Sequence, residues 1–109
     1  MAEVRASTDV PISTGESEFT RFAFRDLAEL RACDIFQPDL SICGGVTEAM
    51  RIEAIASAYQ LRYAPHLWGG ALTFAAGLHT LVVASTGFIV EYSLGANSML
   101  HELAVEDFT

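Results

Sequence analysis

Hydrophobic residues along this chain gather in short runs, which alternate with longer segments of roughly helical apolar spacing. The short runs are apolar at successive positions rather than at every second one. We expect strands over 10–14, 34–37, 61–65 and 88–90, helices over 19–30, 46–60 and 71–85, and a helical turn near 99–103. Strands of this kind are typical of a parallel sheet covered by crossover helices. The pattern predicts an α/β fold of four strand–helix units, in one domain over residues 1–109.

Two threonines stand near the starts of the first two expected helices. Thr20 and Thr47 each precede a helical apolar pattern. A threonine hydroxyl can accept a hydrogen bond from a free backbone N–H in the first turn of a helix. We therefore expect these two side chains to cap the helices that follow them.

The chain is rich in hydrophobic residues for its length. Of its 109 residues, 51% are hydrophobic, and the mean hydropathy is +0.33. A small domain has a large surface for its volume and normally needs more polar residues to cover it. We therefore expect self-association or aggregation through exposed sheet edges, or incorporation into something larger.

The charge pattern excludes several classes of function. The formal net charge is −8, and the six basic residues are all arginines scattered along the chain. Such a chain lacks the basic patch that binds nucleic acid or an anionic membrane surface. Because lysine is absent, a lysine general base, a Schiff-base lysine and the lysine of a phosphate-binding loop are excluded as well.

Three further features bear on the compartment. Residues 67–90 carry no formal charge, but glycines and a histidine interrupt them, so we expect a buried helix and strand rather than a membrane span. The first ten residues show no apolar signal segment, which favours a cytoplasmic location. Cys33 and Cys43 fit no zinc spacing, and we expect them to be buried, reduced thiols rather than a disulfide.

An ionisable residue follows each expected strand at a nearly constant interval. These residues are Glu16, Asp39, His66 and Glu91. A single carboxylate at a strand end is more often structural than catalytic, because Asp and Glu commonly cap the next helix, and a lone histidine there is more often a hydrogen-bonded structural residue. The carboxyl ends of parallel strands share one edge, however, and in α/β barrels that edge holds the active site. The sequence therefore predicts that the four side chains converge on one pocket.

The identities of these four residues suit proton transfer. Asp39 and His66 on neighbouring strands could form a carboxylate–imidazole pair, which would fix the histidine tautomer for general acid/base work. Glu16 could supply an oxygen ligand to a hard cation such as Mg²⁺. Glu91, if held protonated, could stabilise a developing oxyanion.

The motifs around these residues resemble those of the enolase superfamily. The similarity is to its mandelate racemase and muconate lactonizing enzyme subgroup, and within it to acid-sugar dehydratases. The segments that carry it are Thr14-Gly-Glu16, Gln37-Pro-Asp39, Cys43-Gly-Gly45, Ala64-Pro-His66-Leu-Trp-Gly69 and Val90-Glu-Tyr92. They occur in the family's order and spacing over nearly the whole chain.

The resemblance implies a fold and a set of roles. The chain would form a half TIM-type barrel like strands five to eight of the family's barrel, without the first barrel half or the capping domain. The family abstracts the proton α to a carboxylate while Mg²⁺ stabilises the enediolate. By this resemblance Glu16 would be a metal ligand and Asp39 and His66 the acid/base dyad. Glu91 would donate a hydrogen bond to the carboxylate of the substrate, expected to be a sugar acid.

Three interpretations of the function stay open, of which the third rests on the uncharged stretch 67–90 and not on the resemblance. The family's lysine base and two further metal ligands have no counterpart here, so we expect weak or absent Mg²⁺ binding and little activity from the isolated chain. The leading expectation is part of a sugar-acid dehydratase, with a racemase, epimerase or cycloisomerase of the same superfamily as an alternative. The second reading is a non-catalytic half barrel that associates with itself or with a separate N-terminal half. The third is a non-catalytic binding or membrane module.

Overall fold

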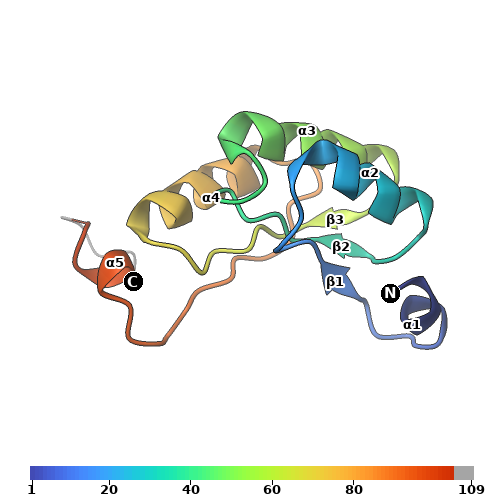
Figure 1. The fold of residues 1–109 in the computed structure, drawn as a ribbon, viewed down its shortest axis with the longest axis horizontal. Coiled ribbons are helices and arrows are strands. Elements are labelled where there is room, and N and C mark those ends of the chain that lie inside the picture. The colour runs from blue at the N-terminus through green and yellow to red at the C-terminus, as the bar shows by residue number, and fades with distance from the viewer. Residues whose placement is uncertain (105–109) are drawn as a thin grey trace.

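A computed structural model describes residues 1–104 of the chain. Short strands alternate with helices, and the strands lie at the centre of the molecule (Figure 1). The elements are α1 (Ala2–Ala6), β1 (Ser13–Thr14), α2 (Thr20–Glu29), β2 (Ile35–Phe36), α3 (Gly45–Ala58), β3 (Arg62–Tyr63), α4 (Ala71–Val83) and α5 (Ser98–His101). The predicted alternation of strands and helices is confirmed, although each strand is only two residues long.

The three strands form one parallel sheet in the order β1-β2-β3. Thr14, Phe36 and Tyr63 lie in register in one row, and Phe36 and Tyr63 are fully buried. Phe36 packs edge to face against Phe24 of α2, with ring centroids 5.0 Å apart. This row therefore faces the helices and forms the core.

The other face of the sheet is only partly covered. Ser13, Ile35 and Arg62 form the adjacent row, and because side chains alternate along a strand, they point away from the helices. Ser13 and Arg62 are exposed. Over residues 1–104 the sheet does not close into a barrel, so the expectation of strands buried on both faces holds for β2 alone.

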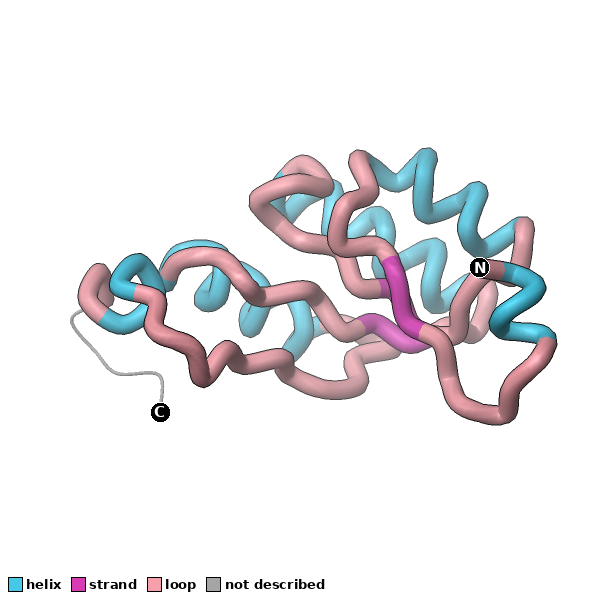
Figure 2. Tube along the Cα trace, turned by 60° about the horizontal axis from the view of Figure 1, so that its bottom comes forward, coloured by secondary structure: helices cyan, strands magenta, loops and turns pink. Residues whose placement is uncertain are grey.

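The fourth predicted strand, at 88–90, is wrong for this structure. The chain meets the sheet at one parallel bridge between Gly87 and Tyr63, where Phe88 N–H donates to the Tyr63 carbonyl at 2.9 Å. Phe88, Ile89 and Val90 are 47%, 50% and 43% exposed. Within residues 1–104 the one strand beside this segment is β3, and the segment leaves the sheet and runs as a loop toward α5 (Figure 2).

Neither threonine caps its helix in the described structure. The chain enters α2 at Phe19, and the N–H of Thr20, the first residue of the helix, donates to the Cys43 carbonyl at 3.1 Å. The next N–H, on Arg21, donates to Glu48 Oε1 of α3 at 2.9 Å. The Arg21 guanidinium also contacts both Glu48 oxygens at 2.8 Å. The α3 helix begins instead after Gly44 in a left-handed conformation. A carboxylate from a neighbouring helix thus replaces the expected local cap of α2.

The α4 helix is two-sided rather than wholly buried. Ala71, Phe74, Gly77 and Thr80 share its buried face, and Phe74 joins a second core cluster with Leu67 and Leu100. On the opposite face Leu72 and Val82 are 84% and 82% exposed. Within residues 1–104, no helix is long and apolar enough to cross a membrane. The apolar residues of α4 therefore pack against the core on one face of the helix and are exposed on the other face.

Both cysteines are free and buried, as expected. Burial raises the pKa of the Cys33 and Cys43 thiols to about 11. A thiol with so high a pKa holds little thiolate at neutral pH, and the thiolate is the reactive form. These two residues therefore belong to the core and not to the chemistry of the protein.

Candidate functional site

Asp39 and His66 are brought together by the register of β2 and β3. The two strands run parallel, and beyond them Asp39 and His66 pair as an isolated parallel bridge. The backbone N–H of His66 donates to the Pro38 carbonyl at 3.0 Å. The side chains meet with His66 Nδ1 2.9 Å from Asp39 Oδ2. The pair predicted from the sequence therefore forms, and backbone pairing fixes its geometry.

The Asp39 carboxylate is buried and fully engaged. It is 4% exposed, and its Oδ1 accepts hydrogen bonds from the Ser41 backbone N–H, at 2.7 Å, and from the Ser41 hydroxyl. Burial alone would raise the pKa of Asp39, but the hydrogen bonds from Ser41 and His66 outweigh it and hold this pKa below its ordinary value. Asp39 is therefore ionised at neutral pH.

This ionisation settles the tautomer of His66. A carboxylate only accepts hydrogen bonds, so Nδ1 of His66 must carry the proton that it donates to Asp39 Oδ2. In the neutral imidazole, Nε2 then holds the free lone pair. His66 thus presents an atom that can accept or return a proton, with its side chain 13% exposed.

Glu16 joins the pair from β1. It follows Gly15, whose φ of +129° turns the chain at the end of the strand. Glu16 Oε2 lies 3.5 Å from His66 Nε2, and the Glu16 side chain is 63% exposed. The carboxylate would therefore form an ion pair with a protonated imidazole. Three of the four predicted strand-end residues thus meet on one edge.

Glu91 lies beside this cluster rather than in it. Its Oε2 accepts a hydrogen bond from the Leu67 backbone N–H at 3.3 Å. It lines a shallow hollow together with Leu67, Trp68, Tyr92 and Ser93. The structure therefore places Glu91 next to Leu67, the residue that follows His66, and Glu91 is the acceptor of the hydrogen bond between them.

Ser41 is the residue of this site that the sequence reasoning missed. It stands two positions after Asp39, where a serine can hydrogen-bond back to the aspartate in a tight turn. The Asp39-Leu-Ser41 spacing was the available indication. It is a weak one, because the same spacing occurs in many turns with no catalytic neighbour.

The described residues do not by themselves make a Mg²⁺ site. Mg²⁺ requires near-octahedral oxygen ligands and is usually held by more than one carboxylate or by substrate oxygens. Among residues 1–104 there is no group of three His, Cys, Asp or Glu side chains that could hold a metal ion. Glu16 offers one exposed carboxylate, and this is not enough for a site.

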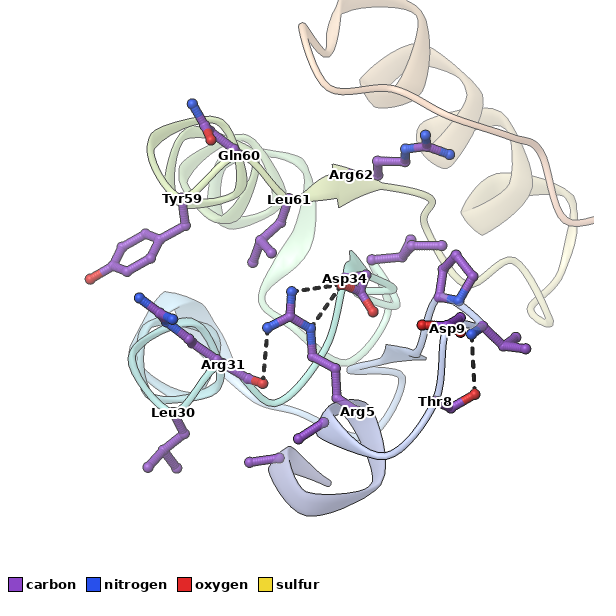
Figure 3. Close-up of a pocket in the computed structure, with 15 residues that line it drawn as sticks. Arg5, Thr8, Asp9, Leu30, Arg31, Asp34, Tyr59, Gln60, Leu61 and Arg62 are labelled. Carbon is purple, nitrogen blue, oxygen red and sulfur yellow. Dashed lines mark hydrogen bonds and ion pairs between the residues drawn. The ribbon is translucent and has the colours of Figure 1, made fainter.

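A further cavity lies at the other end of the sheet. It measures about 820 Å³ and opens beside the amino ends of β2 and β3, near Asp34 and Leu61 (Figure 3). Arg5 of α1 points into it and donates to Asp34 Oδ1 at 2.8 Å and to the Arg31 carbonyl at 3.4 Å. Arg5 thus links α1 to Asp34, the residue before β2, by an ion pair. The candidate proton-transfer groups lie on the opposite edge.

Comparison with known proteins assigns the family. A family model described as enolase C-terminal domain-like matches residues 1–109. D-galactonate dehydratase of Xanthomonas oryzae pv. oryzae (strain PXO99A) is 41% identical over 90 residues, which are 83% of this chain and 24% of that protein. The chain thus belongs to the enolase C-terminal domain-like family, and it spans about a quarter of the length of the curated relatives it matches.

Solved structures agree with this assignment. A mandelate racemase-type protein of Bordetella bronchiseptica RB50, complexed with 2-oxoglutarate/phosphate, matches with a TM-score of 0.93 and 36% identity, covering 99% of this chain and 29% of that one. An enolase of Agrobacterium radiobacter bound to Na and L-malate matches with a TM-score of 0.81 and 32% identity, covering 85% of this chain and 24% of that one. The half-barrel topology is therefore that of enolase-superfamily barrels.

The acidic groups of the structure predict a pH dependence of stability. Hydrogen bonds from Arg5 lower the pKa of Asp34, those from Ser41 and His66 lower that of Asp39, and the N–H of Arg21 lowers that of Glu48. A carboxyl whose folded pKa is depressed stabilises the fold above its unfolded pKa and loses that contribution as pH falls through the folded value. With ordinary values of 3.8 and 4.5, the free energy of unfolding should be level near neutrality and fall below about pH 4.5.

Urea unfolding of the chain between pH 7 and pH 3 measures this dependence. Asp34→Asn should flatten the acid limb, whereas Glu29→Gln, at an exposed position of α2, should leave it unchanged. Equal stability at pH 3 and pH 6 would contradict the expectation.

Proposed function

We propose that this chain supplies the acid/base side of the active site of a sugar-acid dehydratase. The observation that carries the proposal is the buried, ionised Asp39 paired with His66, which leaves Nε2 of the imidazole available for proton transfer. The curated relative that bears the same segment is named D-galactonate dehydratase. The substrate class would therefore be a sugar acid, recognised in part by its carboxylate.

In this proposal His66 moves a proton to or from substrate. Dehydration breaks a C–H bond α to the carboxylate and expels a hydroxyl as water. His66 in its imidazolium form donates the Nε2 proton to the departing hydroxyl, while Asp39 stabilises the charge on the ring. Glu16, 3.5 Å from Nε2, also favours the charged ring. Glu91 lies beside Leu67 and would contact the substrate carboxylate.

The remainder of the site would come from outside this chain. With no lysine here, a lysine base on the other face of the substrate has to be supplied elsewhere. Any Mg²⁺ would likewise need ligands in addition to Glu16. We therefore propose that the isolated chain has little or no dehydratase activity.

The exposed apolar surface supports a second candidate function. Leu72, Val82 and Leu94 are 84%, 82% and 92% exposed, and the β1 edge of the described sheet is unpaired. Open sheet edges and apolar patches are typical association surfaces. We propose that the chain pairs through these surfaces with a complementary N-terminal half, or with itself if that half is absent.

A chimera tests the proposed function. The segment of the Xanthomonas oryzae enzyme that matches this chain would be replaced by residues 1–109, and water loss from D-galactonate would be assayed with Mg²⁺ present. We expect turnover by the chimera and none above background by the isolated chain. A folded chimera that only exchanges the α-proton of its substrate with solvent deuterium would favour the racemase alternative, and a folded but inert one would contradict the proposal.

The same parts can be tested in trans if the chimera does not fold. The chain would be mixed with the relative lacking its matching segment, and sizing chromatography would report whether they form a complex. Activity that appears with the complex supports both proposals. A homodimer that binds nothing else would leave association as the only function supported.

A further inference from the structure

We propose that Ser41 is a positioning residue for the acid/base pair. It holds Asp39 Oδ1, so that Oδ2 is left to face His66 Nδ1 and to fix the tautomer of the ring. The inference rests on the role proposed for His66 above, and it adds a role for Ser41, which that proposal does not include. Ser41 would act through Asp39, which it contacts directly and which in turn contacts His66.

The two oxygens of Asp39 are divided between two partners. Oδ1 accepts hydrogen bonds from the backbone N–H of Ser41, at 2.7 Å, and from the Ser41 hydroxyl. Oδ2 accepts a hydrogen bond from His66 Nδ1 at 2.9 Å. The terminal torsion of an aspartate is soft, so without these donors the carboxylate plane of Asp39 could turn away from the angle at which one oxygen faces His66 Nδ1. Two donors on Oδ1 remove that freedom.

The backbone holds Ser41 at this position. The Asp39 carbonyl accepts hydrogen bonds from the N–H groups of Ile42, at 3.0 Å, and Cys43, at 2.7 Å, which closes a tight turn around Ser41. Cys43 is fully buried, so the turn is anchored in the core. Ser41 itself is exposed. An exposed residue on a core-anchored turn can thus direct a buried carboxylate.

The serine hydroxyl is what makes the arrangement specific. Replacing Ser41 by alanine keeps the backbone N–H and deletes one of the two donors on Oδ1. Because Ser41 is exposed and the backbone N–H stays on Oδ1, we take the contribution of the hydroxyl as about 1 kcal/mol, which corresponds to about a fivefold change in an equilibrium. Without the hydroxyl the Asp39 carboxylate should be held less firmly. We therefore expect the ratio of the Nδ1–H to the Nε2–H tautomer of His66 to fall about fivefold.

The test reads the tautomer directly on the ¹⁵N-labelled chain. At a pH where the imidazole is neutral, the two ring nitrogen shifts of His66 report the fraction protonated at Nδ1. We expect Nδ1–H to dominate in the parent chain and the Nε2–H fraction to rise about fivefold in Ser41→Ala. Ser41→Thr, which retains a hydroxyl, should restore the parent spectrum. Ser17→Ala, an exposed serine beside Glu16, should leave it unchanged.

An unchanged tautomer ratio in Ser41→Ala would overturn the proposal. If the alanine variant loses its fold, Ser41→Cys is read in the same way, because a thiol of similar size is a much weaker donor. In the chimera, Ser41→Ala should lower kcat about fivefold with KM nearly unchanged, and Ser41→Thr should recover it. A tautomer shift in the isolated chain with no such effect on kcat would leave the positioning role standing and count against the role proposed for His66.

Discussion

In the active chimera, His66→Asn is expected to lower kcat for D-galactonate dehydration by about 10²- to 10⁴-fold, the usual contribution of a positioned general acid or base. The asparagine amide can still donate a hydrogen bond toward Asp39 Oδ2, so local structure should be retained. It cannot carry a proton to or from the substrate. The loss should therefore appear in kcat, with a smaller change in KM.

The matched control is His79→Asn. His79 is an exposed histidine on α4, outside the cluster formed by Asp39, His66 and Glu16, and its replacement should leave kcat within about twofold. Steady-state assays of both variants, with circular dichroism to confirm folding, make the comparison. If His66→Asn retained the parent kcat, His66 would be a structural residue and another group would have to transfer the proton.

Gly15→Ala is expected to destabilise the fold by about 2 to 5 kcal/mol. Gly15 has a φ of +129°, which side-chain-bearing residues rarely adopt. A Cβ there would also lie 2.5 Å from Cε1 of Phe24, a fully buried ring packed against Phe36. Backbone strain costs about 1 to 2 kcal/mol and overpacking about 1 to 3 kcal/mol, and neither can relax without moving the core.

Two other glycines separate these effects. Gly45 has a φ of +81° but nothing within 4 Å of an added Cβ, so Gly45→Ala should cost about 1 to 2 kcal/mol from backbone strain alone. Gly95→Ala, where the nearest atom is 3.6 Å away, should cost less than about 1 kcal/mol. Urea or thermal unfolding gives all three values. If Gly15→Ala and Gly45→Ala lowered the free energy of unfolding equally, the Phe24 ring would be moving aside at no cost in free energy.

Because Gly15 immediately precedes Glu16, its variant also reports on the site. If alanine forces β1 to shift, Glu16 should move away from His66 Nε2, now 3.5 Å distant. In the chimera this would appear as a loss of activity larger than the fraction of unfolded protein accounts for. The glycine thus connects core packing to the position of the carboxylate.

The sequence predicted what depends on local pattern. The alternation of short apolar runs with helical segments indicated the order of strands and helices, and the strand ends identified Asp39 and His66 as neighbours. This was possible because parallel pairing of successive strands follows from the short crossovers between them, which leaves few alternatives for the ends. The quoted motifs indicated the family by resemblance, before any contact was known.

The tertiary structure decided what depends on partners far away in the chain. Glu48 caps α2 from 27 residues away, in place of the nearby Thr20. Residues 88–90 leave the sheet, although their composition is that of a buried strand, because in the part of the chain that the structure describes only β3 lies beside them. Apolar spacing reports a tendency to be buried, and whether that burial occurs is determined by which surfaces are present to pack against.

The tertiary structure also decided how the two oxygens of Asp39 are shared between Ser41 and His66. The sequence placed the aspartate, the serine and the histidine, but it could not show which oxygen each donor would reach. That choice follows from the angle of the turn after Asp39 and from the register that brings His66 alongside. Hydrogen bonds require distances and directions correct to a few tenths of an ångström, and only the folded backbone fixes them.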